Sequence, residues 1–342
     1  MIEASYTNAT ISFKEIKELE EQGKNSRVFT AHDKNLDCEL VIKEIKKDIF
    51  DFDKYFNEAR KLYNSSHPNV VQIQYAAQDK KNIYLGFPYY RNGSLHNLMK
   101  NVPLSVSDVL RFSIQFLSGL YHIHTKKLMH FDIKPNNIML SDRGEALLSD
   151  FGLAETINDD GFASPVKLYN MHRAPETFHD QEYDFTTDIY QAGMTIYRML
   201  IGHSRFDLEC DGLFANATPA RLIIDGEFPN KKYPHHVPRS LINIVNKCLS
   251  TNKEDRYPSV QLLLNDLAKI DASDNLSWRM MVDSETMIWH GIKNNAKVIF
   301  SYDTKNKETQ CIREIKNNKT QKVSAFCAKN VSDNQVRSML TM

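Results

Sequence analysis

The stretch "HFDIKPNNIML", residues 130–140, decides how this sequence is interpreted. It places Asp132, Lys134 and Asn137 close together, and "SDFGLA" adds Asp150 a few residues later. Between the two aspartates, the polar turn "SDRGE" separates the apolar runs "IML" and "ALLS". Two short apolar runs around a polar turn predict a hairpin. This hairpin would bring both carboxylates to the same end of a small sheet.

Such a group of polar side chains suits a magnesium ion and a phosphate chain. Carboxylate and amide oxygens are the hard ligands that magnesium prefers. A lysine supplies a positive charge for a phosphoryl group in transfer, and one carboxylate remains to accept a proton from a hydroxyl. The residues themselves therefore indicate phosphoryl-transfer chemistry.

The composition is that of a folded, soluble protein. Of the 342 residues, 42% are hydrophobic and 25% are charged, and this length predicts a two-lobed unit or a main domain with an appendage. Lys plus Arg and Asp plus Glu both number 43, so no net charge draws the whole chain toward nucleic acid or an anionic membrane. The sequence shows no secretory signal and no apolar run long enough to span a bilayer. We therefore expect a cytoplasmic protein with no membrane partner and no nucleic-acid partner.

The hydrophobic pattern changes twice along the chain. Residues 13–90 contain strand-like segments such as "CELVIKEI" and "VVQIQYAA", interrupted by one helical pattern in "DFDKYFNEARKLYN". Residues 95–270 have mainly helical periodicity, with helix starts at Ser, Thr or Pro. Strand-like segments, the last being "KVSAFCA", then return before a terminal helix in "SDNQVRSML". The five cysteines are scattered without a C-x-x-C pair, which favours structural thiols over a zinc site or a disulfide framework.

Together, these motifs resemble those of the eukaryotic-type protein kinases. "HFDIKPNNIML" followed by "SDFGLA" is similar to the catalytic loop and the D-F-G magnesium segment of that family. "ELVIK" resembles its third-strand lysine motif, "FPYYRNGSL" its hinge, "RAPE" the end of its activation segment, and "DIYQAG" the helix that anchors its catalytic loop. In "EDRYPS", Arg256 matches the late arginine that pairs with the glutamate of "RAPE", here Glu176. The resemblance covers roughly residues 13–270.

The resemblance implies an α+β, bilobal protein-kinase fold, in which a β-rich N-lobe with one helix precedes a helical C-lobe. A small β-rich appendage with a terminal helix would come after the C-lobe. The implied boundaries are 1–86 for the N-lobe, 87–90 for the hinge, 91–270 for the C-lobe and 272–342 for the appendage.

The resemblance also implies roles for individual residues. Asp132 would align the attacking hydroxyl and take its proton, and Lys134 would stabilise the travelling γ-phosphoryl group. Asn137 and Asp150 would hold Mg²⁺, with Mn²⁺ as an alternative. The residues implied to bind ATP are Lys43, held by Glu58, on the α and β phosphates; Gly23 in the glycine-rich loop; Val28, Val41 and Met139 around adenine; and Phe87, as gatekeeper, with Tyr90 at the hinge.

The glycine-rich loop departs from the family pattern. Aligned on Val28, its three glycine positions hold Glu21, Gly23 and Ser26. Gly23 occupies the middle position, where the backbone comes closest to the phosphates. This departure leaves open a second hypothesis, a pseudokinase scaffold that binds nucleotide or a protein partner without catalysis. A small-molecule phosphotransferase is a third, although such enzymes lack equivalents of "RAPE" and "DIYQAG".

Phe131 is a further departure. In most of the family an arginine at this position pairs with a phosphate on the activation segment, and phenylalanine cannot do so. "HFDIKP" is similar to the variant in some plant receptor-like kinases. We therefore expect activity that does not depend on phosphorylation within residues 153–173. Lys134 is typical of serine/threonine kinases, so the expected substrate is a protein with a serine or threonine acceptor, although Tyr169 lies near a position that holds threonine in that group.

Residues 272–342 lie outside the resemblance to the kinase domain. Their Trp-containing strand run is more loosely similar to bacterial serine/threonine kinases that carry a β-rich appendage. The segment has more Lys and Arg than Asp and Glu, which we interpret as a solvated strand face rather than a nucleic-acid surface. It is a candidate binding site for a regulator or a substrate.

Overall fold

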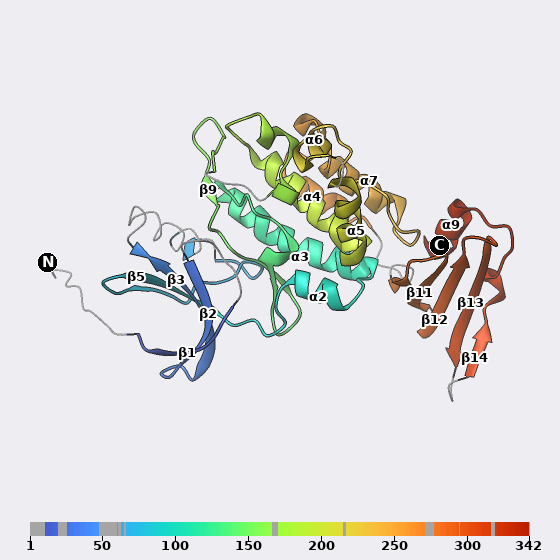
Figure 1. Cartoon of the computed structure of the whole chain (residues 1–342), viewed down its shortest axis with the longest axis horizontal. Helices are drawn as coiled ribbons and strands as arrows, with labels where there is room; N and C mark the ends of the chain where they lie inside the picture. Colours follow the sequence, from blue (N-terminus) through green and yellow to red (C-terminus); the bar gives the residue numbers. More distant parts are fainter. Residues whose placement is uncertain are drawn as a thin grey trace. The chain divides into compact units, whose positions relative to one another are not determined.

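The computed structural model divides the chain into two compact units, which meet in sequence between Arg91 and Asn92 (Figure 1). It describes residues 11–19, 26–47, 60, 63–64, 66–165, 170–214, 217–270, 277–293, 295–315 and 319–341. The predicted helix in "DFDKYFNEARKLYN" falls almost wholly outside these described residues, as do Glu21, Gly23, Glu58 and Tyr169.

The first unit is built on a five-stranded antiparallel sheet with the strand order β1-β2-β3-β5-β4. The strands are β1 (Phe13–Glu18), β2 (Ser26–Asp33), β3 (Cys38–Lys46), β4 (Tyr75–Gln78) and β5 (Asn82–Pro88). Alternation along β2 and β3 buries Phe29, Ala31, Leu40 and Ile42 in one cluster, as expected for a strand with one covered face. The strand-rich first lobe is therefore confirmed.

The segment "VVQIQYAA" was predicted as one strand, but only its last three residues belong to a strand. β4 begins at Tyr75, although Val70 and Val71 are buried. The reason lies in the Gln72 side chain, whose Nε2 donates to the carbonyl oxygens of His67 and Val70, both at 3.1 Å. These carbonyl groups therefore bond to a side chain rather than to a neighbouring strand. The chain passes through a loop before it joins the sheet at Tyr75.

The helical patterns in "SVSDVLRFSIQFLSGLYHIH", "TTDIYQAGMTIYRMLIG", "PRSLINIVNKCLS" and "PSVQLLLNDLAKI" predict four helices, and the described residues of the second unit form these four and three more before the C-terminal sheet. The predicted helices are α3 (Val106–Thr125), α4 (Phe185–Ile201), α7 (Arg239–Cys248) and α8 (Val260–Leu267). The additional ones are α2 (Leu95–Asn101), α5 (His203–Phe214) and α6 (Pro219–Ile224). Each additional helix buries only two or three side chains, so its helical periodicity is weak in the sequence.

Helix α4 lies at the centre of this helical part. Every residue from Thr187 to Ile201 is buried, which is the pattern of a helix covered on all sides. Gly193 lets α7 approach, because a Cβ atom at this position would collide with the Cβ of Cys248. A smaller feature of this unit is the hairpin of β7 (Ile138–Leu140) and β8 (Ala146–Leu148), which confirms the hairpin that the sequence predicted.

The C-terminal segment forms a second five-stranded antiparallel sheet in simple sequence order, with a helix after it (Figure 1). Its elements are β10 (Arg279–Val282), β11 (Thr286–Lys293), β12 (Ala296–Asp303), β13 (Glu308–Ile315), β14 (Lys319–Lys322) and α9 (Asp333–Thr341). The β-rich appendage with a terminal helix is thus confirmed. The predicted strand "KVSAFCA" is wrong beyond Lys322, because the N–H groups of Phe326 and Cys327 bond back to Val323 and Ser324 and form a 3₁₀ turn.

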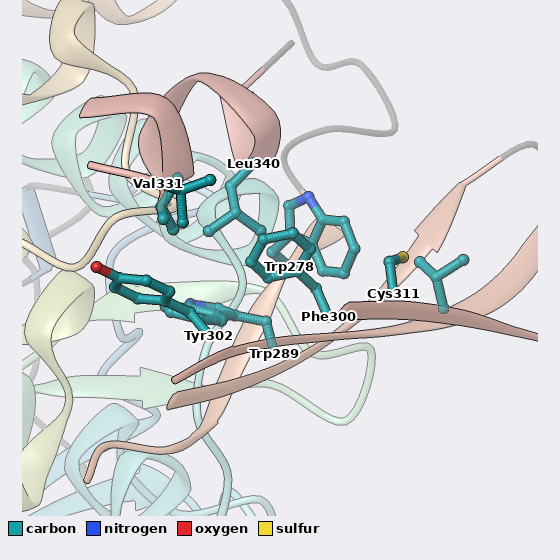
Figure 2. Close-up of a cluster of buried hydrophobic side chains, with 9 residues drawn as sticks. Trp278, Trp289, Phe300, Tyr302, Cys311, Val331 and Leu340 are labelled. Carbon is teal, nitrogen blue, oxygen red and sulfur yellow. The ribbon is translucent and has the colours of Figure 1, made fainter. Parts of the chain in front are cut away.

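One face of this sheet carries an aromatic core (Figure 2). Trp289 and Phe300 are fully buried as cross-strand partners, and α9 covers them with Val336 and Leu340. Trp278 packs directly on the backbone of Gly291, where a Cβ atom would lie 2.5 Å from the indole ring. Aromatic and aliphatic burial of this kind is the main stabilising term for so small a sheet.

Hydrogen bonds join this sheet to the helical part of the same unit. The indole N–H of Trp289 donates to Nδ1 of His236 at 3.0 Å. The guanidinium of Arg337 on α9 donates to the carbonyl of Val237 at 2.6 Å. Arg279 on β10 forms an ion pair with Asp108 on α3 at 2.6 Å. The sheet is therefore part of the same compact unit as the helices.

Two further features bear on the cellular setting. All five cysteines lie in the described part of the chain and are free thiols, of which Cys210, Cys248 and Cys311 are buried. None of the helices formed by the described residues has the length and apolar character needed to cross a bilayer.

A buried ion pair closes the helical part. Arg256 donates from both terminal nitrogens to the two carboxylate oxygens of Glu176, each at 2.8 Å, and both residues are buried. Burial alone would raise the pKa of Glu176, but its bonds with Arg256 lower that pKa below the usual value. This stabilisation is therefore complete above the unfolded-state pKa and is lost as the pH falls through the folded-state pKa.

We predict that Arg256→Met lowers the free energy of unfolding at pH 7 by about 3–5 kcal/mol, because Glu176 would remain buried without its cation. Urea unfolding followed by circular dichroism measures this loss. Arg221→Met, which breaks the exposed pair of Arg221 with Asp225, is the matched control and should cost about 0.5 kcal/mol. Equal losses in the two variants would contradict the prediction.

Candidate active site

The segment His130–Ile133 is held by side chains that project from one face of α4. Asp188 accepts the backbone N–H of His130 through Oδ2 and that of Phe131 through Oδ1, both at 2.8 Å. Gln191 accepts the N–H of Ile133 at 3.0 Å and donates to the carbonyl of Phe131 at 2.8 Å. Residues three apart on a helix share a face, so these two side chains together hold the backbone of His130, Phe131 and Ile133, the residues on either side of Asp132.

Asp188 carries a buried negative charge. It is fully buried, and its Oδ2 also lies 2.8 Å from Nε2 of His124 on α3. Burial would raise the pKa of this carboxyl, but the bond from His124 and the backbone donor of His130 hold it below the usual value. A charged acceptor makes each of these hydrogen bonds stronger than a neutral pair would be.

Phe131 adopts a conformation that its residue type avoids. Its φ is +64°, in the left-handed region that is costly for a residue with a bulky side chain. The ring is fully buried with Met129, Ala163 and Tyr183, and its centroid lies 6.0 Å from that of Tyr183. Because α4 holds the backbone of Phe131 on both sides, packing and hydrogen bonding together maintain this turn.

The turn presents the carboxylate of Asp132 to two neighbours. Its Oδ2 accepts from Nζ of Lys134 at 2.9 Å and from Nδ2 of Asn137 at 2.7 Å. The same Nδ2 donates to the carbonyl of Asp132 at 2.9 Å. The other carboxylate oxygen, Oδ1, is buried and has no hydrogen-bond partner among the described residues. Three of the predicted residues are thus in direct contact, and one acceptor atom is left over.

The imidazole of His130 connects this loop to the segment that carries Asp150. Its Nδ1 accepts the backbone N–H of Asp132 at 3.2 Å, and its Nε2 donates to the carbonyl of Ser149 at 3.1 Å. Burial lowers the pKa of His130, so the ring is the neutral tautomer that this pattern requires. Ser149 also donates through its N–H and its hydroxyl to the carbonyl of Asn137, at 2.9 and 3.0 Å.

Asp150 therefore comes directly after a residue that is bonded to the loop. It has a φ of +60°, and its Oδ1 accepts the N–H of Gly152 at 3.4 Å. Asn137 uses its Nδ2 on Asp132, so its amide oxygen remains as a possible metal ligand. An amide oxygen and a nearby carboxylate are the hard donors that suit Mg²⁺. The residues present thus fit a magnesium ion.

The activation segment is connected to the same loop by His172. This residue is fully buried; its Nδ1 donates to the carbonyl of Ile133 at 2.9 Å, and its Nε2 accepts from Arg198 on α4 at 2.9 Å. Burial and the charge of Arg198 hold the pKa of His172 well below its ordinary value. The ring is therefore a neutral link between α4, the loop and the "RAPE" region.

Four of the predicted nucleotide-binding residues of the first unit share one face of its sheet. The register pairs Val28 with Lys43, and Val41 with Phe87. Since residues two apart on a strand point to the same side, Val28, Val41, Lys43 and Phe87 lie on a common face. Tyr90 comes after β5, whereas Met139 is the middle residue of β7 in the second unit.

Three residues of the site were not among those predicted. Gln191 lies three positions after Asp188 on α4, so its spacing in "DIYQAG" was the available signal. His124 lies in the predicted helical stretch before "HFDIKPNNIML", and no local pattern indicates its contact with Asp188. His172 precedes "RAPE" directly, but a single histidine in a loop carries no specific signal.

Comparison with known proteins points to one family. A sequence model of the protein kinase domain matches residues 15–267. The serine/threonine-protein kinase STE20 of Saccharomyces cerevisiae is 28% identical over 271 residues, which cover 76% of this chain and 28% of that protein. The serine/threonine-protein kinase PknD of Protochlamydia amoebophila is 25% identical over 283 residues, covering 72% and 28%.

A third relative is similar over a shorter region. The probable serine/threonine-protein kinase samkA of Dictyostelium discoideum is 33% identical over 168 residues, covering 48% of this chain and 26% of that protein. The chain thus spans less than a third of the length of these relatives. The domain match nevertheless covers most of the chain, and the loop geometry agrees with it: this chain belongs to the protein kinase family.

Proposed function

We propose that the protein is an ATP- and magnesium-dependent kinase that phosphorylates serine or threonine hydroxyls of a protein substrate. The carboxylate of Asp132 carries this proposal. One of its oxygens is fixed by Lys134 and Asn137, and the other is buried without a hydrogen-bond partner among the described residues. An unsatisfied buried acceptor is costly, and a substrate hydroxyl that donates to it would remove that cost.

The roles of the neighbouring residues are consistent with their contacts. In our proposal Asp132 orients the attacking hydroxyl and receives its proton, while Lys134 stabilises charge on the γ-phosphoryl group. Asn137 and Asp150 would hold magnesium, which when bound neutralises the phosphate oxygens. Lys43, paired with Glu58, would contact the α and β phosphates, and Gly23 would lie against them. Val28, Val41 and Met139 would contact adenine, with Phe87 and Tyr90 at the hinge.

We also propose that turnover does not require phosphorylation of the activation segment. In most of the family an arginine at position 131 binds such a phosphate, whereas here the buried Phe131 packs on Ala163 and Tyr183. His172 supplies a second, neutral contact between the segment and the loop. Apolar packing and a neutral hydrogen bond therefore support the segment without added charge.

A cytoplasmic location is a further proposal, supported by the five free thiols, which suit a reducing compartment.

Asp132→Ala should lower the rate of phosphoryl transfer by about 10²–10⁴-fold, the usual contribution of a general base. Radiolabelled ATP with a protein acceptor measures this rate. Asp142→Ala, in the exposed turn of "SDRGE", is the matched control and should be as active as wild type. Label on neither wild type nor variant would favour the pseudokinase scaffold, and ATP consumption that depends on a small acceptor would favour the small-molecule phosphotransferase.

Gln191→Met should lower kcat by about 10- to 100-fold, because the backbone on either side of Asp132 would lose two hydrogen bonds and small displacements of reacting groups are costly. The KM for ATP should change little, since the side-chain hydrogen bonds of Gln191 go to the loop backbone. Gln181→Met, at an exposed position, controls for the substitution itself. A rise in KM with unchanged kcat would contradict a positioning role.

The combined change of Thr156 and Ser164 to Ala and of Tyr169 to Phe should leave kcat within about twofold of wild type. The reason is that the segment is supported by the packing of Phe131 rather than by a phosphate. The assay uses enzyme pretreated with a phosphatase, so that no earlier phosphate contributes. Loss of most of the activity in this triple variant would refute independence from phosphorylation.

A further inference from the structure

The aromatic core of the C-terminal sheet covers only part of the face on which it lies. Helix α9 packs over one end, where Tyr302, Val331 and Leu340 are gathered, and Cys311 lies at the other end of the cluster (Figure 2). At that other end is a pocket of about 360 Å³. It is lined by Trp278, Lys293, Val298, Cys311, Arg313 and residues 321–326.

The sheet register explains how the pocket is built. Val298 on β12 pairs with Gly291 on β11 and with Arg313 on β13, and Arg313 pairs with Gln321 on β14. The absence of a side chain at Gly291 admits the ring of Trp278. Trp278, Val298 and Cys311 are each 3% exposed, so the floor of the pocket is apolar and firmly packed.

The charged residues of the pocket all have the same sign. Lys293, Arg313 and Lys322 are among the described residues that line it, and none of those residues is Asp or Glu. Nζ of Lys293 lies 4.4 Å from the ring centroid of Phe326. Arg313 donates to Oε1 of Gln321 at 3.3 Å. Phe326 and Gln321 are both neutral. The two contacts therefore orient Lys293 and Arg313 without adding negative charge to the pocket.

The pocket borders an edge of the sheet. Among the described strands, β14 pairs with β13 alone, and the side chains of all its residues are exposed. An edge strand offers backbone N–H and C=O groups to an extended peptide. Residues 321–326, which leave this edge, form one wall of the pocket. Lys293 and Arg313 lie on the same face of the sheet as Val298, whereas Lys322 pairs with Ile312 and lies on the other face. A peptide added along β14 would thus pass beside Arg313, on the face that also carries Lys293.

We propose that this pocket binds a phosphorylated serine or threonine within an extended peptide. A phosphate carries a charge of about −1.5 to −2 at pH 7 and three strong acceptor oxygens, which complements the two cations of this face, Lys293 and Arg313, better than a single carboxylate does. The inference rests on the proposed function in one respect: a serine/threonine kinase would produce the phosphorylated peptide that this pocket binds. Single-stranded nucleic acid is a poorer match because the Trp278 ring is buried and offers no face for base stacking.

The test is direct binding to the full-length protein, measured by fluorescence anisotropy in the absence of ATP. The probe is a fluorescein-labelled peptide library with a central phosphoserine and random flanking residues, compared with the same library carrying serine or glutamate. We expect saturable binding of the phosphoserine peptides, binding by the serine peptides at least tenfold weaker, and glutamate peptides in between. Inorganic phosphate at millimolar concentration should compete only weakly, because it lacks the peptide backbone.

Arg313→Gln and Lys293→Met should each weaken binding by about 10- to 100-fold, the range for loss of a charge-assisted contact. Lys297→Met is the matched control, because Lys297 is exposed on β12 and alternates with Val298 toward the opposite face. Thermal unfolding confirms that each variant is folded. Because both target side chains are partly exposed, either variant alone is sufficient for the test.

Three outcomes would overturn the proposal: equal affinity for serine and phosphoserine peptides, equal weakening by Arg313→Gln and Lys297→Met, or displacement of the peptide by a single-stranded oligonucleotide that binds more tightly. Binding should be unchanged in Asp132→Ala. A failure of the kinase proposal would therefore appear in the phosphoryl-transfer assay and leave this measurement intact.

Discussion

The geometry of the site in the second unit depends on the hydrogen bonds that the carboxylate of Asp188 accepts. This carboxylate lies inside the protein with its charge retained, and it accepts two backbone N–H groups of the loop and a bond from His124. A buried charge is tolerated only when it is fully hydrogen-bonded. Because Asp188 must keep these hydrogen bonds, the N–H groups of His130 and Phe131 must both point at its carboxylate, which fixes the backbone of these two residues. Asp132, which we propose as the catalytic base, is the next residue along the chain.

This arrangement stores a small amount of backbone strain at the site. The left-handed turn at Phe131 costs on the order of 1–2 kcal/mol for a residue with a side chain. The hydrogen bonds from Asp188 and Gln191 and the burial of the Phe131 ring together outweigh that cost. Helix α4 can act as a rigid base because it is buried along its length and because Gly193 lets Cys248 pack closely against it. The position of the Asp132 carboxylate is thus set by packing around α4.

Much of this architecture could be predicted from the sequence, and the failures have physical causes. The long helices α3 and α4 and the hairpin around "SDRGE" have strong local patterns, because their apolar residues repeat with the period of their structure. Helix α5 buries few side chains and carries little such signal. The contacts of His124, Gln191 and His172 join residues that are 39–64 positions apart, so no local pattern records these partners, although the spacing of "DIYQAG" indicates that Gln191 shares a helix face with Asp188. The strand "KVSAFCA" was wrong because a 3₁₀ turn satisfies its backbone, which composition does not reveal.

The bonds of Arg337 and Trp289 have a consequence for how such proteins are assembled in evolution. Family similarity stops at residue 267, yet the loop before α7 depends on residues of the C-terminal sheet and its helix. Val237 is bonded to Arg337, and His236 is buried against Trp289 with a pKa lowered to about 3. A chain ended at the limit of similarity would expose this imidazole to water and leave that carbonyl without its donor. The C-terminal sheet therefore cannot be replaced by an unrelated domain without cost. A replacement would also require changes at His236 and Val237, the residues that bond to it.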